Sequence, residues 1–258
     1  MNKPQLHTYD CGGACAFSTT RHGGVSKGEY GEFNINGYCG DDEDDIAINK
    51  AALCAELGID ETHLIIPHQC HGIDSRMIAG EYFSLPTDVR NMIIDKVDAV
   101  MTDEKGICVG VSTADCIPIL LYDAEHHAVC AVHAGWRGTV AKIVMSTLIS
   151  MRVSFDSRPA DVKAIVGPGI SLKNFEVGQE VYDQFAKAGF DMNAIAKMED
   201  KWHIDLPECN RQQMLEAGMK IENIQMSGIC TYDENADYFS ARRQGIDSGR
   251  IYTGIILR

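Results

Sequence analysis

Side chains that could do chemistry gather in three short clusters, at residues 67–72, 112–116 and 133–138. The first contains two histidines and a cysteine, the second ends at Cys116, and the third begins at His133. Two imidazoles and one thiolate form a natural ligand set for zinc, and copper also favours nitrogen and sulfur. Three protein ligands leave a fourth position open for water or substrate, which distinguishes a catalytic metal site from a structural one. The residue types therefore predict a catalytic metal site that uses Cys116, His133 and a more distant histidine.

Several histidines compete for this site, because the long gap between the first and second clusters carries no geometric constraint. His68 competes with His71, and either His126 or His127 could replace His133. A cysteine near a strand is usually a buried core residue, and a lone histidine is usually hydrogen-bonded for structural reasons. Residue types and spacing alone leave these alternatives open.

Strands must position the second and third clusters. The apolar runs at residues 107–112, 117–122 and 128–133 predict three successive strands. Cys116 immediately precedes the second of these strands, and His133 ends the third. Residues at corresponding ends of neighbouring strands converge, and ligands are usually bound at such ends. We therefore expect the thiol and the imidazole to lie close together.

The remaining elements indicate a mixed α/β protein. An acidic run at residues 41–45 precedes a predicted helix over 46–57 that stops at Gly58, and residues 17–36 are predicted to be strand ends and loops. Further helices are predicted over residues 138–151, over 177–188 and from Pro207 to Gly218, with further strands over 164–166, 221–226 and 251–257. No repeat or linker interrupts this pattern. The simplest prediction is one α/β domain that comprises residues 1–258.

Composition narrows the function classes. The chain has 258 residues and a net charge of −14, which argues against nucleic acid as a partner. The N-terminus has no apolar run of signal-peptide length, and no segment approaches the ~18 apolar residues of a membrane span. The 10 cysteines include no CxxC pair and suggest reduced thiols rather than a disulfide framework. We expect a cytoplasmic protein without membrane segments.

Ordered motifs along nearly the whole chain resemble those of the laccase-domain family, also called the polyphenol-oxidase or multicopper-laccase-like family. The matching runs include Gln-Cys-His-Gly at 69–72, Thr-Ala-Asp-Cys-Ile-Pro at 113–118 and His-Ala-Gly-Trp-Arg-Gly at 133–138. Weaker matches lie at 17–26, 33–34, 167–170, 175–178, 230–231, 239–240, 242–243 and 249–250. The segment 77–95 is longer than is usual in the family.

This resemblance implies a ligand set and a fold. The family binds its metal through the histidine of Gln-x-His-Gly, the cysteine of Ala-Asp-Cys and the histidine of His-Ala-Gly-Trp, which correspond here to His71, Cys116 and His133. The expected fold has mixed β-sheets packed between flanking α-helices, in αββα-like layers. Zinc is the expected metal, with copper as the alternative.

The resemblance also implies a reaction. Similar family members are described as purine nucleoside phosphorylases that cleave adenosine, inosine or methylthioadenosine with phosphate and also deaminate adenosine. The expected partners are thus a purine nucleoside and phosphate, and the sequence makes no prediction of oligomeric state. Candidates for substrate or phosphate binding are Arg137, Arg242, Arg243, Arg21 and Asn34. Asp115 could hold a ligand in position or could instead cap a turn.

Three other functions compete with this prediction. A copper-dependent polyphenol oxidase is the first, although true laccase sites need more paired histidines than the 9 scattered ones here. The second is a metal-free hydrolase in which Cys116 is the nucleophile and His133 its base. The third is a binding module that zinc merely stabilises.

Overall fold

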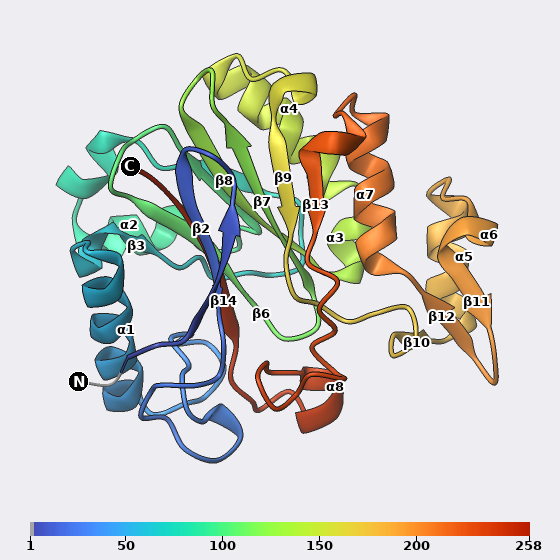
Figure 1. Ribbon diagram of the computed structural model, residues 1–258, viewed down its shortest axis with the longest axis horizontal. Helices are drawn as coiled ribbons and strands as arrows, with labels where there is room; N and C mark the ends of the chain where they lie inside the picture. Colours follow the sequence, from blue (N-terminus) through green and yellow to red (C-terminus); the bar gives the residue numbers. More distant parts are fainter. Residues whose placement is uncertain (1–2) are drawn as a thin grey trace.

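The computed structural model describes residues 3–258 and contains two stacked β-sheets with helices on both outer faces (Figure 1). The first sheet has the order β1-β2-β14-β6-β3, and the second has the order β13-β9-β7-β8-β5-β4. The first comprises β1 (Leu6–Asp10), β2 (Ala14–Thr19), β14 (Ile251–Leu257), β6 (Cys108–Thr113) and β3 (Leu64–Ile65). The second comprises β13 (Ile224–Met226), β9 (Lys163–Val166), β7 (Ile117–Asp123), β8 (Ala128–Ala134), β5 (Ala99–Thr102) and β4 (Ser75–Met77).

Alternating side chains on β6 join the two sheets and a helical layer. Val109 and Val111 pack into a buried cluster with Leu120 of β7 and Val129 of β8, so this cluster fills the space between the sheets. Cys108, on the opposite face of β6, belongs to a second cluster beneath α1. The period of two along the strand thus places successive residues in different layers of the core.

Helices cover the outer faces of both sheets. α1 (Glu43–Leu57) packs on the five-stranded sheet, while α3 (Trp136–Val140), α4 (Ile143–Phe155) and α7 (Leu206–Glu216) pack on the six-stranded sheet (Figure 1). The predicted fold class, mixed sheets between flanking helices, is therefore confirmed. The remaining helices are α2 (Thr87–Ile93), α5 (Gln179–Lys187), α6 (Met192–Ile195) and α8 (Ala241–Gln244). With α5 and α6, a small sheet of β10 (Glu176–Val177), β12 (Trp202–Ile204) and β11 (Ala196–Met198) projects from the right-hand end in Figure 1.

The acidic run begins a helix, as predicted. The carboxylate of Asp42 accepts hydrogen bonds from the backbone N–H groups of Asp44 and Asp45, and Gly58 ends α1 at φ 66°. The acidic side chains of the first turn also lie at the positive end of the helix dipole. The helix starts three residues before its predicted first residue because its capping carboxylate lies inside the acidic run.

Two predicted elements were wrong in extent. The single helix expected over 138–151 is two helices, because Lys142 adopts a left-handed conformation with φ 64° between α3 and α4. At this break, the carbonyl oxygen of Thr139 accepts from the backbone N–H of Lys142 at 3.1 Å, and the Gln213 amide donates a second hydrogen bond to it at 2.9 Å. The strand expected over 221–226 begins only at Ile224, after a 3₁₀ turn. In the described part of the chain, no helix has the length and apolarity needed to cross a bilayer.

Candidate metal centre

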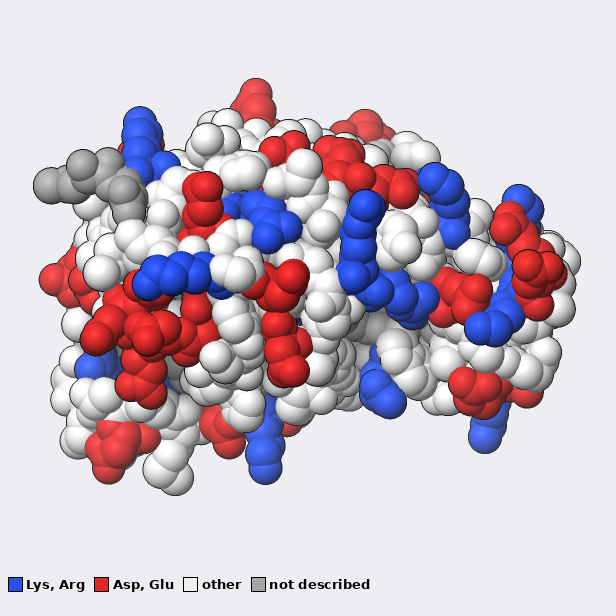
Figure 2. Space-filling model, turned by 90° about the horizontal axis from the view of Figure 1, so that it is seen from below, with Lys and Arg blue, Asp and Glu red and all other residues white. Residues whose placement is uncertain are grey.

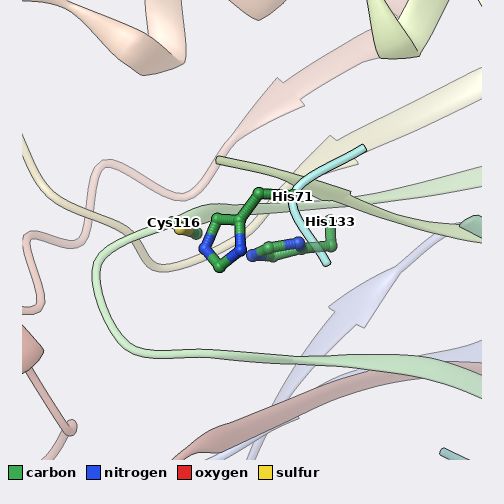
Figure 3. Close-up of side chains that lie close together, drawn as sticks. All are labelled: His71, Cys116 and His133. Carbon is green, nitrogen blue, oxygen red and sulfur yellow. The ribbon is translucent and has the colours of Figure 1, made fainter. Parts of the chain in front are cut away.

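The three predicted ligands come from three segments. They meet at the end of the six-stranded sheet where β7 begins and β8 finishes. In the antiparallel pair β7–β8, Pro118 lies opposite His133, so Cys116 and His133 occupy the same edge, as expected. His71 belongs to the loop that connects β3 with β4. The ligand atoms of all three side chains lie within 4.8 Å of one another, and the side chains point toward a common point (Figure 3). The rings of His71 and His133 meet edge to face, with centroids 4.8 Å apart.

Asp98, just before β5, connects two of these residues. Its fully buried carboxylate accepts a hydrogen bond of 2.7 Å from Nδ1 of His133. The same carboxylate accepts hydrogen bonds from three successive backbone N–H groups, those of Cys70, His71 and Gly72, at 3.2, 2.9 and 2.7 Å. Since Nδ1 of His133 is engaged, Nε2 is left to face Cys116 and His71. One carboxylate therefore fixes the ring of one histidine and the backbone of the other.

The backbone of His71 has an unusual conformation. Its φ is 64°, which few residues other than glycine adopt. The three hydrogen bonds to Asp98 hold this conformation, and they present the imidazole toward the cavity. Such a constrained residue is common at ligand-binding sites, where the surrounding structure offsets the local strain.

Charge stabilises the Cys116–His133 pair. Burial disfavours the charged forms of both groups, but His133 and His71 lower the pKa of the Cys116 thiol to about 6. Burial likewise opposes charge on His133, yet the thiolate and Asp98 raise the pKa of its imidazole to about 9. Asp98 is itself buried, and its hydrogen bond with His133 lowers the pKa of its carboxyl group to about 2. The thiol is thus held as the thiolate, which is the form that binds metal.

The donor set fits a soft or borderline metal ion. One thiolate and two imidazoles, one of them fixed by a carboxylate, match the ligands that Zn²⁺ binds in catalytic sites. His71 is exposed, Cys116 is partly exposed and His133 is buried, so one side of the group opens to solvent. A metal held by these three residues would keep a position free toward that side.

Gly135 lies directly against the group. A Cβ at this position would come within 2.8 Å of Cδ2 of His71 and 3.0 Å of Sγ of Cys116. With φ −69° and ψ 167°, the backbone of Gly135 suits any residue, so the close approach itself explains the need for glycine.

We therefore expect Gly135→Ala to weaken metal binding without removing a ligand. The added methyl group must displace His71 or Cys116, and a displaced ligand typically lowers metal affinity by about 10- to 100-fold. Metal titration against a chelating indicator measures this change. Gly37→Ala is a suitable control because a Cβ there meets no atom within 4 Å. Unchanged affinity in Gly135→Ala would show that the three side chains are not the ligands.

The group lies in a cavity of about 530 Å³. Its lining includes all three candidate ligands together with the aromatic rings of Tyr38, His68, Trp136 and Phe175. The rings of Tyr38 and His68 stack at 4.4 Å. The hydroxyls of Ser112 and Thr113 are buried without a partner among the described residues, and both residues line the cavity. The cavity thus combines flat apolar surfaces with unused polar groups, as small-molecule sites do.

The predicted anion-binding residues are distributed unevenly around this cavity. Arg242 lines it, and Nη1 of Arg242 donates to the carbonyl oxygens of Asn174 and Glu176. Arg137 and Arg243 lie outside the lining, with their guanidinium groups over Trp136 and Tyr232. Figure 2 shows basic side chains gathered right of the centre of one face and acidic side chains predominating at its left.

The other predicted polar residues have structural partners. Arg21 donates to the carbonyl oxygens of Gly31 and Asn235, and Asn34 is fully buried and bonds to Asp41. Asp115 lines the cavity, but its carboxylate accepts from the Thr231 hydroxyl at 2.7 Å and from the backbone N–H of Arg242 at 2.6 Å. It therefore anchors the start of α8, which carries Arg242, and contacts neither histidine of the group.

Asp98, Arg250 and the aromatic lining of the cavity were not among the site residues predicted from the sequence. Asp98 comes three residues after Asp95 and directly before the short apolar run 99–101, and nothing in its spacing to His71 or His133 reveals the connection. Arg250 lines the cavity, but three backbone carbonyl oxygens, those of Ser248, Gly249 and Ile246, occupy its guanidinium group. Trp136, Phe175 and Arg250 lie within runs that match the family motifs, and this was the available signal for them, whereas Asp98 lies in no such run.

Comparisons with known proteins agree with this arrangement. Residues 15–258 match the family model described as "Multi-copper polyphenol oxidoreductase laccase". A purine nucleoside phosphorylase of Bacteroides thetaiotaomicron is 45% identical over 244 residues, which cover 93% of this chain and 90% of that protein. Adenosine deaminase RL5, from an unknown prokaryotic organism, is 39% identical over 249 residues, which cover 94% of each. The crystal structure of YlmD from Geobacillus stearothermophilus superposes with a TM-score of 0.88 at 30% identity, covering 96% of this chain and 93% of that one.

Proposed function

Since the chain belongs to the family of the multi-copper polyphenol oxidoreductase laccases, we propose that it is a metal-dependent purine nucleoside phosphorylase that also deaminates adenosine. The observation that carries this proposal is the group of His71, Cys116 and His133 on the wall of a nucleoside-sized cavity. Relatives named for the same two activities cover most of the chain.

The donor atoms favour one zinc ion over a multi-copper centre. Among residues 3–258, one group of three or more His, Cys, Asp or Glu residues has ligand atoms close enough to hold an ion. Three histidines outside that group form hydrogen bonds with aspartates instead, namely His22, His68 and His126. Laccase chemistry requires further copper sites built from additional histidines and sulfur ligands. A single site with two imidazoles and one thiolate is better suited to zinc.

Zinc bound there would supply a Lewis acid that polarises an oxygen atom and activates water near neutral pH. The protein would hold the ion through His71, Cys116 and His133. Asp98 would keep Nε2 of His133 directed at the ion by accepting the hydrogen bond from Nδ1. This arrangement suits hydrolytic deamination, in which water replaces the amino group of adenosine to give inosine and ammonia.

The cavity wall offers recognition groups for a nucleoside. The stacked pair of Tyr38 and His68, together with Phe175, provides flat surfaces on which a purine can lie.

Arg242 is our candidate for the phosphate site. Phosphorolysis breaks the bond between the base and ribose C1′ and joins a phosphate oxygen to C1′, so adenosine and phosphate give adenine and ribose-1-phosphate. Arg242 lines the cavity, and among residues 3–258 only Nη1 of its guanidinium group donates hydrogen bonds, to the carbonyl oxygens of Asn174 and Glu176. The remaining donors can bind a phosphate dianion.

We expect Arg242→Met to raise the KM for phosphate by about 10- to 100-fold, because charge-assisted hydrogen bonds contribute about 1.5–3 kcal/mol. Steady-state kinetics with varied phosphate at saturating adenosine measures this. Arg243→Met is the matched control, since the neighbouring guanidinium lies outside the cavity lining and donates to the carbonyl oxygen of Tyr232. Equal phosphate KM values in the two variants would remove Arg242 from the phosphate site.

A metal-free cysteine hydrolase is the second candidate, because Cys116 and His133 form a thiolate–imidazolium pair. This mechanism has no use for His71. Activity that survives in His71→Ala would favour the hydrolase, whereas the metal-dependent enzyme requires all three side chains. Product analysis tests the lead proposal: adenosine with phosphate should yield adenine and ribose-1-phosphate, and adenine release at full rate without phosphate would contradict it.

A further inference from the structure

A second cavity, of about 330 Å³, adjoins the first outside the metal site. It lies among α1, the 3₁₀ turn Glu61–His63, β3 and α2. Its lining includes two basic side chains, Lys50 of α1 and Arg90 of α2, and one acidic side chain, Glu61. Tyr82 and Ile94 provide apolar surface beside these charges. The charged groups of the lining are thus two basic and one acidic, in a protein whose overall net charge is −14.

Arg90 has an unsatisfied donor at this cavity. Its Nε is buried and has no hydrogen-bond partner among the described residues, and it is the one charged group among the six such side-chain atoms. Nη2 of Arg90 donates to the Thr87 hydroxyl at 3.1 Å, and the guanidinium carbon lies 5.9 Å from the ring centroid of Tyr82. Buried polar groups are almost always paired, and an unpaired donor on a cation is especially costly. The arrangement therefore indicates a missing acceptor.

The ammonium group of Lys50 also lacks a hydrogen-bond acceptor among the described residues. Its side chain is partly buried, and it makes no hydrogen bond or ion pair within 4.0 Å among residues 3–258. Burial lowers the pKa of its ammonium group, and Glu61 opposes this effect from a distance. A desolvated ammonium group without a partner gains from a nearby anion.

We propose that this cavity binds a phosphate-bearing small molecule between Lys50 and Arg90. Two cations facing one carboxylate leave an excess of positive charge that a phosphate group neutralises. Phosphate oxygens can accept from the guanidinium group of Arg90 and from the ammonium group of Lys50, since both residues line the cavity, and they match the guanidinium geometry. Tyr82 and Ile94 offer an apolar surface to the uncharged part of the ligand.

Tyr38 connects this cavity with the metal cavity. It lines both of them, and its ring stacks on His68, three residues before the candidate ligand His71. A ligand in the second cavity therefore lies against the aromatic wall of the first. The proposal does not rest on the reaction at the metal site, because none of its cationic residues belongs to the metal cavity.

Equilibrium dialysis with radiolabelled inorganic phosphate tests the proposal, with adenosine monophosphate as a second probe. We expect the wild-type chain to bind one more anion than Lys50→Met/Arg90→Met, because any anion in the metal cavity remains in both proteins. Arg152→Met/Lys187→Met is the matched control. It makes the same two substitutions on exposed side chains of α4 and α5, and it should retain the full number of bound anions.

Equal binding of both probes by the wild-type chain and the Lys50→Met/Arg90→Met variant would overturn the proposal. If the double variant fails to fold, Lys50→Met alone serves as the test, with Lys187→Met as its control. Among residues 3–258, the Lys50 side chain forms no hydrogen bond or ion pair whose loss would unfold the chain, so a lost anion in that variant reports on the cavity. A variant that loses one bound anion and keeps phosphorolysis supports this second site. Absence of phosphorolysis in the wild-type chain would count against the proposed function and not against this site.

Discussion

Cys116→Ser is expected to lose bound metal and to lower nucleoside turnover by at least about 1,000-fold, because removal of one ligand of three abolishes a catalytic metal site. Serine has nearly the same shape, but its hydroxyl is a far weaker ligand than a thiolate. Cys116 lies next to both histidines, and they lower the pKa of its thiol. Its replacement therefore removes the thiolate, which is the one anionic ligand of the group. Elemental analysis and adenosine turnover measure the two effects.

Cys70→Ser provides the control for this variant. Cys70 precedes His71 and its thiol donates to Asp98 at 3.4 Å, a hydrogen bond that a serine hydroxyl can replace. It does not belong to the ligand group, so metal content and turnover should stay close to wild type. Full metal content in Cys116→Ser would show that the cysteine is not a ligand.

Asp98→Asn is expected to lower both stability and metal affinity. The NH₂ group that replaces one carboxylate oxygen cannot accept a hydrogen bond. The donors on that oxygen therefore lose their partner, either the N–H groups of Cys70 and Gly72 at Oδ2 or those of His71 and the His133 ring at Oδ1. Breaking such a buried charged network costs about 3–5 kcal/mol of unfolding free energy. Loss of the support for His133 should lower metal affinity by about 10- to 100-fold. Urea denaturation of the metal-free protein and metal titration separate the two effects.

Asp123→Asn is a closely matched control for that variant. Asp123 is also fully buried, and it accepts hydrogen bonds from two backbone N–H groups and from the His126 ring at 2.8 Å. It lies outside the metal cavity. We expect Asp123→Asn to lose stability and keep its metal affinity. If both variants retain the same metal affinity, Asp98 has a structural role alone.

The sequence predicted much of the fold because its central strands are continuously apolar. β6, β7 and β8 are buried along their whole length, so their hydrophobic runs coincide closely with the strands. The break at Lys142 was not predictable, since lysine is a good helix former and neither glycine nor proline stands at the left-handed position. β11 and β12 are three residues each, too short for an alternating pattern to emerge.

The candidate site was predictable in part. Cys116 and His133 are neighbours across a local strand pair, which spacing along the chain reveals. The choice of His71 over His68 required the family motif, and in the structure the His68 ring instead bonds to Asp95 at 2.6 Å. Asp98 and the cavity walls come together only through the packing of two sheets, and no local pattern records that contact. The position of Arg242 also depends on contacts between distant segments. Its backbone N–H donates to Asp115, and its guanidinium group donates to the carbonyl oxygen of Glu176.

We expect His71, Cys116 and His133 to hold one catalytic metal ion. The most direct test measures metal content and adenosine phosphorolysis on one sample, before and after treatment with a chelator. We predict one zinc ion per chain in the active protein, loss of ribose-1-phosphate formation in step with loss of zinc, and recovery on zinc addition. Full phosphorolysis by protein that contains no metal would contradict the account.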